Sequence, residues 1–166
     1  IIGLGRIGAL VAARLQGFGT EILAYDPYVT SARAAQLNVK LVTLDELLEQ
    51  ADFVTIHMPL NDETRNLFNA ESIAKMKSDA VVLNMARGGI VNEKDMYEAL
   101  VAGKIGGYCT DVMENEVAGD GLTEGAGFDS PLFTCDNFIV SPHIGAQTVE
   151  AQKRIGAELV DIIEAL

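Results

Sequence analysis

Short apolar runs alternate with stretches of helical periodicity along most of the chain. The apolar runs predict buried strands at residues 1–4, 22–25, 40–42, 53–57, 80–84, 105–110 and 138–140. Apolar residues at helical spacing predict helices at 7–18, 31–37, 43–50, 70–76 and 93–102, and a long amphipathic helix at 148–166. Because buried strands that alternate with helices are typical of a parallel sheet covered on both faces, the pattern predicts an α/β, doubly wound fold.

Two polar segments refine this pattern. Thr43 and Glu46 have the spacing of a capping box, so we expect the helix at 43–50 to begin there. Residues 115–129 are rich in Gly, Asp, Glu and Ala, which favours an exposed loop.

Length and composition narrow the class of protein. A chain of 166 residues can bury one core of ordinary size, which favours a single domain. The formal net charge of −12 argues against nucleic acid and anionic membrane surfaces as partners, because both are negatively charged. No apolar run approaches the roughly 18 residues of a membrane span. Cys109 and Cys135 lack metal-ligand spacing, so we expect a cytoplasmic protein with free thiols and no metal site.

A glycine motif, Gly3-Leu4-Gly5-Arg6-Ile7-Gly8, joins the first predicted strand to the first predicted helix. In this context Gly3 permits a tight turn, Gly5 lets a pyrophosphate approach the backbone, and Gly8 lets the helix pack on the strand. The N–H groups around Arg6 and Ile7 open the helix and suit phosphate. Asp26 ends the second strand, where its carboxylate can bind the adenosine ribose and repel a 2′-phosphate, which favours NAD over NADP. An S-adenosylmethionine-binding domain remains the alternative, because it also uses a glycine-rich first turn and an acidic second strand end.

Further motifs follow in a characteristic order. They are Tyr25-Asp26-Pro27, His57-Met58-Pro59-Leu60 with Glu63-Thr64, Asn84-Met85-Ala86-Arg87-Gly88-Gly89, Asp111-Val112 and Ser141-Pro142-His143-Ile144-Gly145-Ala146. With the glycine motif, this set resembles the D-isomer-specific 2-hydroxyacid dehydrogenases over essentially all 166 residues. The resemblance implies a Rossmann-type dinucleotide-binding fold that binds NAD and spans residues 1–166. It also implies that the substrate domain is absent from this chain, with the helix at 148–166 leading toward it. The start at Ile1, within the first strand, agrees with an excerpt of a longer protein.

The resemblance also implies roles for individual residues. Arg87 matches the arginine that holds the substrate carboxylate, His143 the acid/base histidine, and Glu116 the carboxylate that orients that histidine. Asp111 matches a residue that contacts the nicotinamide carboxamide. Further positions match the cofactor site: Met58, Pro59, Met85, Ala86, Gly145 and Ala146. We interpret His57 as part of the wall of the cofactor pocket.

Each candidate has a simpler explanation. His143 can be an ordinary loop histidine, Arg87 a solvated turn residue, and Glu116 an exposed carboxylate. Glu116 is followed by Val117, where the family usually has proline, and this departure bears on the exact placement of Glu116.

Two hypotheses for function follow. The first is an NAD-dependent oxidoreductase acting on a D-2-hydroxy acid, most similar around His143 to the 3-phosphoglycerate branch and expected to be a homodimer. The excerpt alone is then expected to bind the cofactor with little or no turnover. The second is an NAD-sensing regulatory module like the co-repressors that share this fold.

Overall fold

The structure is a computed structural model that describes residues 1–114 and 129–165. Its strands are β1 (Leu23–Ala24), β2 (Lys40–Leu41), β3 (Phe53–Ile56), β4 (Val81–Asn84), β5 (Gly107–Thr110) and β6 (Phe138–Val140). Its α-helices are α1 (Arg6–Leu15), α2 (Ser31–Gln36), α3 (Leu44–Gln50), α4 (Ala70–Ala74), α5 (Glu93–Val101) and α6 (Val149–Glu164). Two 3-10 helices, η1 (Gln16–Phe18) and η2 (Pro131–Thr134), complete the described elements.

All strand pairs within the described residues are parallel, and Ile2 joins them into one sheet. β1 pairs with β2, and β3, β4, β5 and β6 pair in that order. Ile2 forms bridges to Tyr25 and to Ile56, so the first segment lies between β1 and β3. The chain therefore builds outward from Ile2 toward β2, then crosses over and builds toward β6. Such a reversal creates a crevice at the carboxyl ends of the two strands that flank it, where ligands of this fold class bind.

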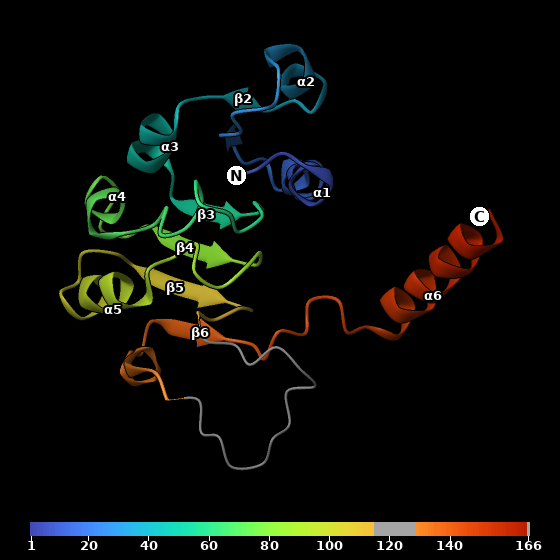
Figure 1. Cartoon of the computed structure of the whole chain (residues 1–166). Helices are drawn as coiled ribbons and strands as arrows, with labels where there is room; N and C mark the ends of the chain where they lie inside the picture. The colour runs from blue at the N-terminus through green and yellow to red at the C-terminus, as the bar shows by residue number, and fades with distance from the viewer. Residues whose placement is uncertain (115–128, 166) are drawn as a thin grey trace.

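Two clusters of buried apolar side chains lie on opposite faces of the sheet. One cluster, under α1 and α2, consists of Ile1, Leu4, Ala12, Ile22, Ala24, Ala34 and Val39. The larger cluster includes Leu47, Val54, Ile56, Val82 and Tyr108 and lies toward α3, α4 and α5, which form one layer (Figure 1). Helices lie on both faces, and the predicted α/β doubly wound fold is confirmed.

One face of the second half of the sheet is less well covered than the pattern predicts. Phe53 and Ile139 lie on the face opposite Val54 and Tyr108, and their side chains are 71% and 67% exposed. Helix α6 stands apart from the sheet (Figure 1) and leaves its apolar residues exposed: Val149, Ile155, Leu159, Val160, Ile162 and Ile163. Both surfaces are therefore apolar and uncovered within the described part of the chain.

Local signals account for the remaining element boundaries. The capping box is present, because Thr43 Oγ1 accepts from Glu46 N at 3.2 Å and Glu46 Oε2 accepts from Thr43 N at 2.8 Å. The first helix ends at Leu15, and its predicted last turn tightens into η1 before Gly19, whose φ is 70°. The sequence pattern does not predict η2, whose four residues are too few to show a helical period. The predicted loop at 115–129 falls almost entirely outside the described residues.

A search of the described residues finds no helix long and apolar enough to cross a bilayer. The same residues contain no group of three or more His, Cys, Asp or Glu side chains placed to hold a metal ion.

Candidate cofactor and active site

The glycine motif forms the turn between Ile2 and α1, and each glycine meets a different constraint. Gly3 has a φ of 90°, and a Cβ added there would lie 2.7 Å from the backbone oxygen of His57. A Cβ at Gly8 would lie 1.9 Å from the oxygen of Gly3, so α1 contacts the turn too closely for any side chain. A Cβ at Gly5 would meet nothing within 4 Å. This open approach leads to the N-terminus of α1, whose first N–H groups have no partner within the helix.

Asp26 closes the same crevice from the end of β1. Its Oδ2 accepts a hydrogen bond from Leu4 N at 2.8 Å, and its Oδ1 accepts one from Tyr28 N at 2.9 Å. The carboxylate therefore connects the glycine turn to the end of β1. It retains lone pairs that can accept hydrogen bonds from hydroxyl groups. The sequence pattern predicts the position of Asp26 but not its bond to the glycine turn.

A contact across the crevice was not predicted. Tyr28 Oη donates to Glu63 Oε2 at 3.2 Å, which joins the segment after β1 to the segment after β3. The Glu63 charge and this hydrogen bond raise the pKa of Tyr28, as does the charge of Asp26. Two carboxylates therefore lie near Tyr28, and together they disfavour an additional negative charge there.

The segment after β3 supplies the opposite wall of the crevice. His57 is half-buried, burial lowers its pKa, and its Nε2 lies 3.0 Å from Thr55 Oγ1. Met58 lies against Gly3, because a Cβ on that glycine would come within 2.9 Å of Met58 Cγ. The oxygen of Pro59 accepts a hydrogen bond from Thr64 Oγ1 at 2.7 Å, which fixes the loop that follows. His57 and Met58 thus lie beside the glycine turn, and the resemblance implies a cofactor contact for Met58.

Arg87 projects from a tight turn after β4. Asn84 holds this turn: its Nδ2 donates to Arg87 O at 2.9 Å, and its Oδ1 accepts from Ala86 N at 3.2 Å. Gly88 is required because a Cβ there would lie 1.9 Å from Met113 O. The Arg87 side chain is exposed, and its Nη1 donates to Ala86 O at 2.6 Å. Met85, on the same turn, is 44% exposed, whereas Ala86 is buried.

His143 lies on a second turn, after β6, that is anchored by Asp111. Both Asp111 oxygens are used: Oδ1 accepts from Ser141 Oγ and from Ile144 N at 3.0 Å, and Oδ2 accepts from Gly145 N at 2.8 Å. Burial raises the pKa of Asp111, but these hydrogen bonds and the charge of His143 lower it, leaving the pKa below its ordinary value. His143 is exposed and has a φ of 52°, and Ala146 is exposed beside it.

The structure brings three of the predicted site positions to adjacent strand ends. Arg87 follows β4, Asp111 follows β5 and His143 follows β6, and these strands are parallel neighbours. Glu116 lies outside the described residues.

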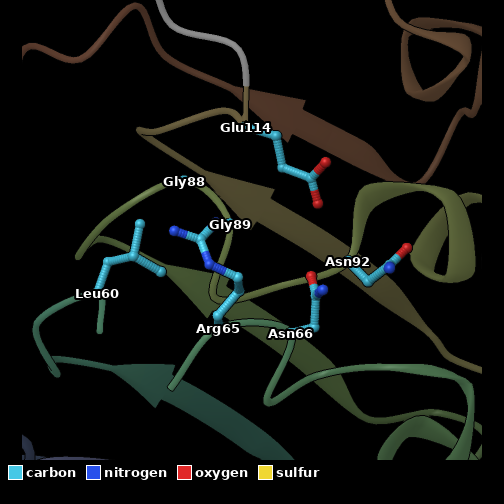
Figure 2. Close-up of a pocket in the computed structure, with 7 residues that line it drawn as sticks. All are labelled: Leu60, Arg65, Asn66, Gly88, Gly89, Asn92 and Glu114. Atoms are coloured by element: carbon cyan, nitrogen blue, oxygen red, sulfur yellow. The ribbon is translucent and has the colours of Figure 1, made fainter. Parts of the chain in front are cut away.

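A polar pocket of about 250 Å³ lies beside the Arg87 turn (Figure 2). Its lining consists of Leu60, Arg65, Asn66, Gly88, Gly89, Asn92 and Glu114. Glu114 is held in place because its Oε1 accepts from Glu93 N at 3.0 Å while its own N–H donates to Glu93 Oε1 at 2.7 Å. The pocket shares Gly88 and Gly89 with the turn that presents Arg87. It was not predicted, because its residues come from three separate loops.

Comparison with known proteins decides the family. Residues 1–145 match the family described as "D-isomer specific 2-hydroxyacid dehydrogenase, NAD binding domain". The chain belongs to this family. The match decides between the two cofactors that the glycine motif left open, in favour of NAD over S-adenosylmethionine.

Relatives of this NAD-binding domain are longer proteins. The chain is 42% identical over 163 residues to D-3-phosphoglycerate dehydrogenase of Mycobacterium leprae, covering 98% of the chain and 29% of the relative. It is 43% identical over 163 residues to hydroxypyruvate reductase of Thermotoga maritima, covering 98% of the chain and 50% of the relative. The crystal structure of D-lactate dehydrogenase with NAD+ from Lactobacillus jensenii matches with a TM-score of 0.86 at 29% identity, covering 98% of this chain and 50% of that one. The chain therefore spans half or less of the length of these relatives.

Proposed function

We propose that this NAD-binding domain is the cofactor half of an enzyme that transfers hydride between NAD and a D-2-hydroxy acid. The observation that carries the proposal is the position of Arg87 and His143 on turns after β4 and β6, the two strands on either side of β5, at the carboxyl edge that also bears the glycine crevice. Ligands of doubly wound folds bind at this edge.

The residues of the crevice fit a dinucleotide. Gly5 and the N-terminus of α1 would hold the pyrophosphate, and the Asp26 carboxylate would accept hydrogen bonds from the adenosine ribose hydroxyl groups. Asp26 and Glu63 together repel a ribose phosphate, which supports NAD over NADP as the cofactor. Met58, Pro59, Met85, Ala86, Gly145 and Ala146 line the remainder. When bound, NAD supplies the acceptor for the hydride that leaves C2 of the substrate.

The two exposed side chains divide the remaining chemistry. Arg87 binds the substrate carboxylate with its planar guanidinium, which orients C2. His143 accepts the proton of the 2-hydroxyl group as the C2–H bond breaks, so the product is a 2-keto acid and the proton rests on the imidazole. Glu116 is proposed to favour the charged imidazole.

The apolar surfaces that this domain leaves uncovered support a larger protein. Phe53 and Ile139 on the sheet, and the exposed face of α6, need cover that the described residues do not provide. We propose that a substrate domain and a second copy in a homodimer supply it, with α6 leading toward the substrate domain. The cysteines of the described part, Cys109 and Cys135, are free, which is compatible with the proposed cytoplasmic location.

The test is a reduction assay with the full-length protein, NADH and a panel of 2-keto acids that includes 3-phosphohydroxypyruvate, hydroxypyruvate and pyruvate. We expect turnover with at least one of them and, by similarity to the 3-phosphoglycerate dehydrogenases, the highest kcat/KM with 3-phosphohydroxypyruvate. Tight NADH binding without turnover of any 2-keto acid would contradict the proposal and favour the regulatory-module hypothesis.

A further inference from the structure

Three polar side chains are almost completely buried at the carboxyl ends of β4 and β5. Asn84 and Thr110 are each 1% exposed, and Asp111 is 6% exposed. Burial of polar groups is costly unless they are hydrogen-bonded, and these three are bonded to one another's backbone and to the two functional turns. All three are therefore interior residues that lie directly beneath the two turns.

Asn84 and Thr110 connect the Arg87 turn to β5. The Asn84 side chain bonds to both ends of that turn, at Ala86 N and Arg87 O. The backbone oxygen of Asn84 in turn accepts from Asp111 N at 3.1 Å and lies 3.1 Å from Thr110 Oγ1. The same hydroxyl contacts Val112 O and accepts from Val112 N at 3.1 Å. The exit of β5 is therefore fixed against the exit of β4 through Thr110.

Asp111 continues the connection to the His143 turn. It receives three hydrogen bonds from Ser141, Ile144 and Gly145, on both sides of His143 in the sequence. His143 itself has a φ of 52°, in the left-handed region that a non-glycine residue adopts only when its surroundings hold it there. The bonds to Asp111 provide that restraint.

We propose that Asn84, Thr110 and Asp111 form a polar brace that fixes the Arg87 turn and the His143 turn relative to each other. This inference rests on the proposed function, because the spacing matters only if both side chains act on one substrate. In the brace the three are positioning residues, since they act through the turns they hold, and this role of Asp111 is separate from the nicotinamide contact that the resemblance implies for it. Preorganised chemistry depends on such support, because an error of about 1 Å in placement can cost a factor of about 100 in rate.

Tyr108 lies next to the brace and is shielded from solvent. It is 1% exposed on β5, and burial raises its pKa to about 12. Hydrogen bonds with the Thr110 and Asn84 side chains offset part of that shift. Because the phenol stays neutral, the brace contains no second buried negative charge beside Asp111.

The test compares Thr110→Val with Thr110→Ser in the full-length protein. Valine keeps the branched shape and removes the hydroxyl, whereas serine keeps the hydroxyl and removes a methyl group. We expect Thr110→Val to lower kcat with the best 2-keto acid by roughly 10- to 100-fold while the Kd for NADH changes by less than about twofold, and Thr110→Ser to stay closer to wild type. The thermal unfolding midpoint of each variant shows whether it is folded at the assay temperature.

Each other outcome has a distinct meaning. A wild-type kcat in Thr110→Val would overturn the brace. A loss of kcat that is larger in Thr110→Ser than in Thr110→Val would also overturn it, because the methyl group and not the hydroxyl would then be what matters. If Thr110→Val does not fold, Ser141→Ala takes its place, because it removes the hydroxyl bond to Asp111 from a half-buried position. Unchanged kcat in Ser141→Ala would then overturn the brace. If the wild type reduces no 2-keto acid, the proposed function fails first and the brace fails with it.

Discussion

Single residues in the glycine turn carry constraints of different kinds. Gly8 has no room for a Cβ because of the Gly3 oxygen, whereas Gly5 faces open space. We therefore expect Gly8→Ala to destabilise the fold by about 1–3 kcal/mol or more, as overpacked positions do. Gly5→Ala should keep the wild-type unfolding midpoint but weaken NADH binding, because its methyl group enters the open space where we propose that the pyrophosphate binds. Thermal unfolding and NADH fluorescence titration measure the two effects, and a stable Gly8→Ala protein would contradict this account.

Asp111 makes the stability of the His143 turn depend on pH. Its folded pKa lies below the ordinary value of 3.8, so its contribution is fully present above 3.8 and is lost as the pH falls through the lower folded value. Asp111→Asn should therefore lose less of its unfolding free energy than wild type as the pH falls below 3.8. Urea unfolding at a series of pH values measures this difference. Asp136→Asn, at an exposed position, is the control, and an acid response of Asp111→Asn equal to that of wild type would refute the assignment.

The residues that could be predicted from sequence are those whose role is set locally. Gly3, Gly5 and Gly8 follow from a strand–turn–helix pattern, and Asp26 from its place at a strand end. Asn84 and Thr110 lie 26 positions apart and meet only because β4 and β5 pair in one register. No pattern along the chain carries that information, so the brace required the structure.

At the scale of elements, α3 has the clearest local determinant. Its capping box satisfies N–H groups at the helix start, and the hydrogen bonds from Thr43 lower the pKa of Glu46. Thr43→Ala should cost about 1 kcal/mol of unfolding free energy, a typical loss for an N-cap hydroxyl. Thr43→Ser keeps the hydroxyl and should stay near wild type in the same urea titration. Equal losses in the two variants would show that the methyl group, and not the cap, stabilises the helix.

Helix α6 contributes no residue to either apolar core of the described part of the domain. Nearly all of its residues are exposed, and Gln152 Nε2 donates a hydrogen bond to Ala146 O in the preceding segment at 3.2 Å. Deleting residues 149–166 from this chain should leave the unfolding midpoint and the NADH affinity unchanged, because neither core contains a residue of α6. Calorimetry and fluorescence titration of the shortened chain check this. A clear loss of either property would show that α6 packs on the domain.

The predicted helices agree with the structure to within one or two residues where periodicity and capping agree, whereas the four-residue η2 has no pattern that predicts it. The helix at 93–102 was predicted to stop at Gly103, and α5 ends at Val101. The strands are shorter than their apolar runs, because hydrophobicity extends past the paired residues at 22–25 and 105–110. The sequence predicts that both faces of the sheet are covered, but one face is partly exposed. An apolar strand indicates that its side chains are buried, and it does not indicate which segment buries them.

At the scale of the whole molecule, the domain has two notable features. The proposed cofactor site lies at the carboxyl edge of its sheet, and two apolar surfaces are exposed, one on the sheet and one on α6. The chain covers 29% of one relative and 50% of another, which supports the proposal that further parts of a longer protein cover the two apolar surfaces. Its fold could be predicted from sequence almost completely, whereas the arrangement of Arg87, Asp111 and His143 depended on the order β4-β5-β6.

The central claim is that the His143 turn completes an active site on this edge. The most direct measurement is the kcat and the NADH Kd of His143→Gln in the full-length protein. Glutamine keeps hydrogen-bonding capacity but cannot accept the proton, so kcat should fall by about 10²- to 10⁴-fold while the Kd changes by less than about twofold. A parallel loss of kcat and NADH affinity, or an unchanged kcat, would contradict the account.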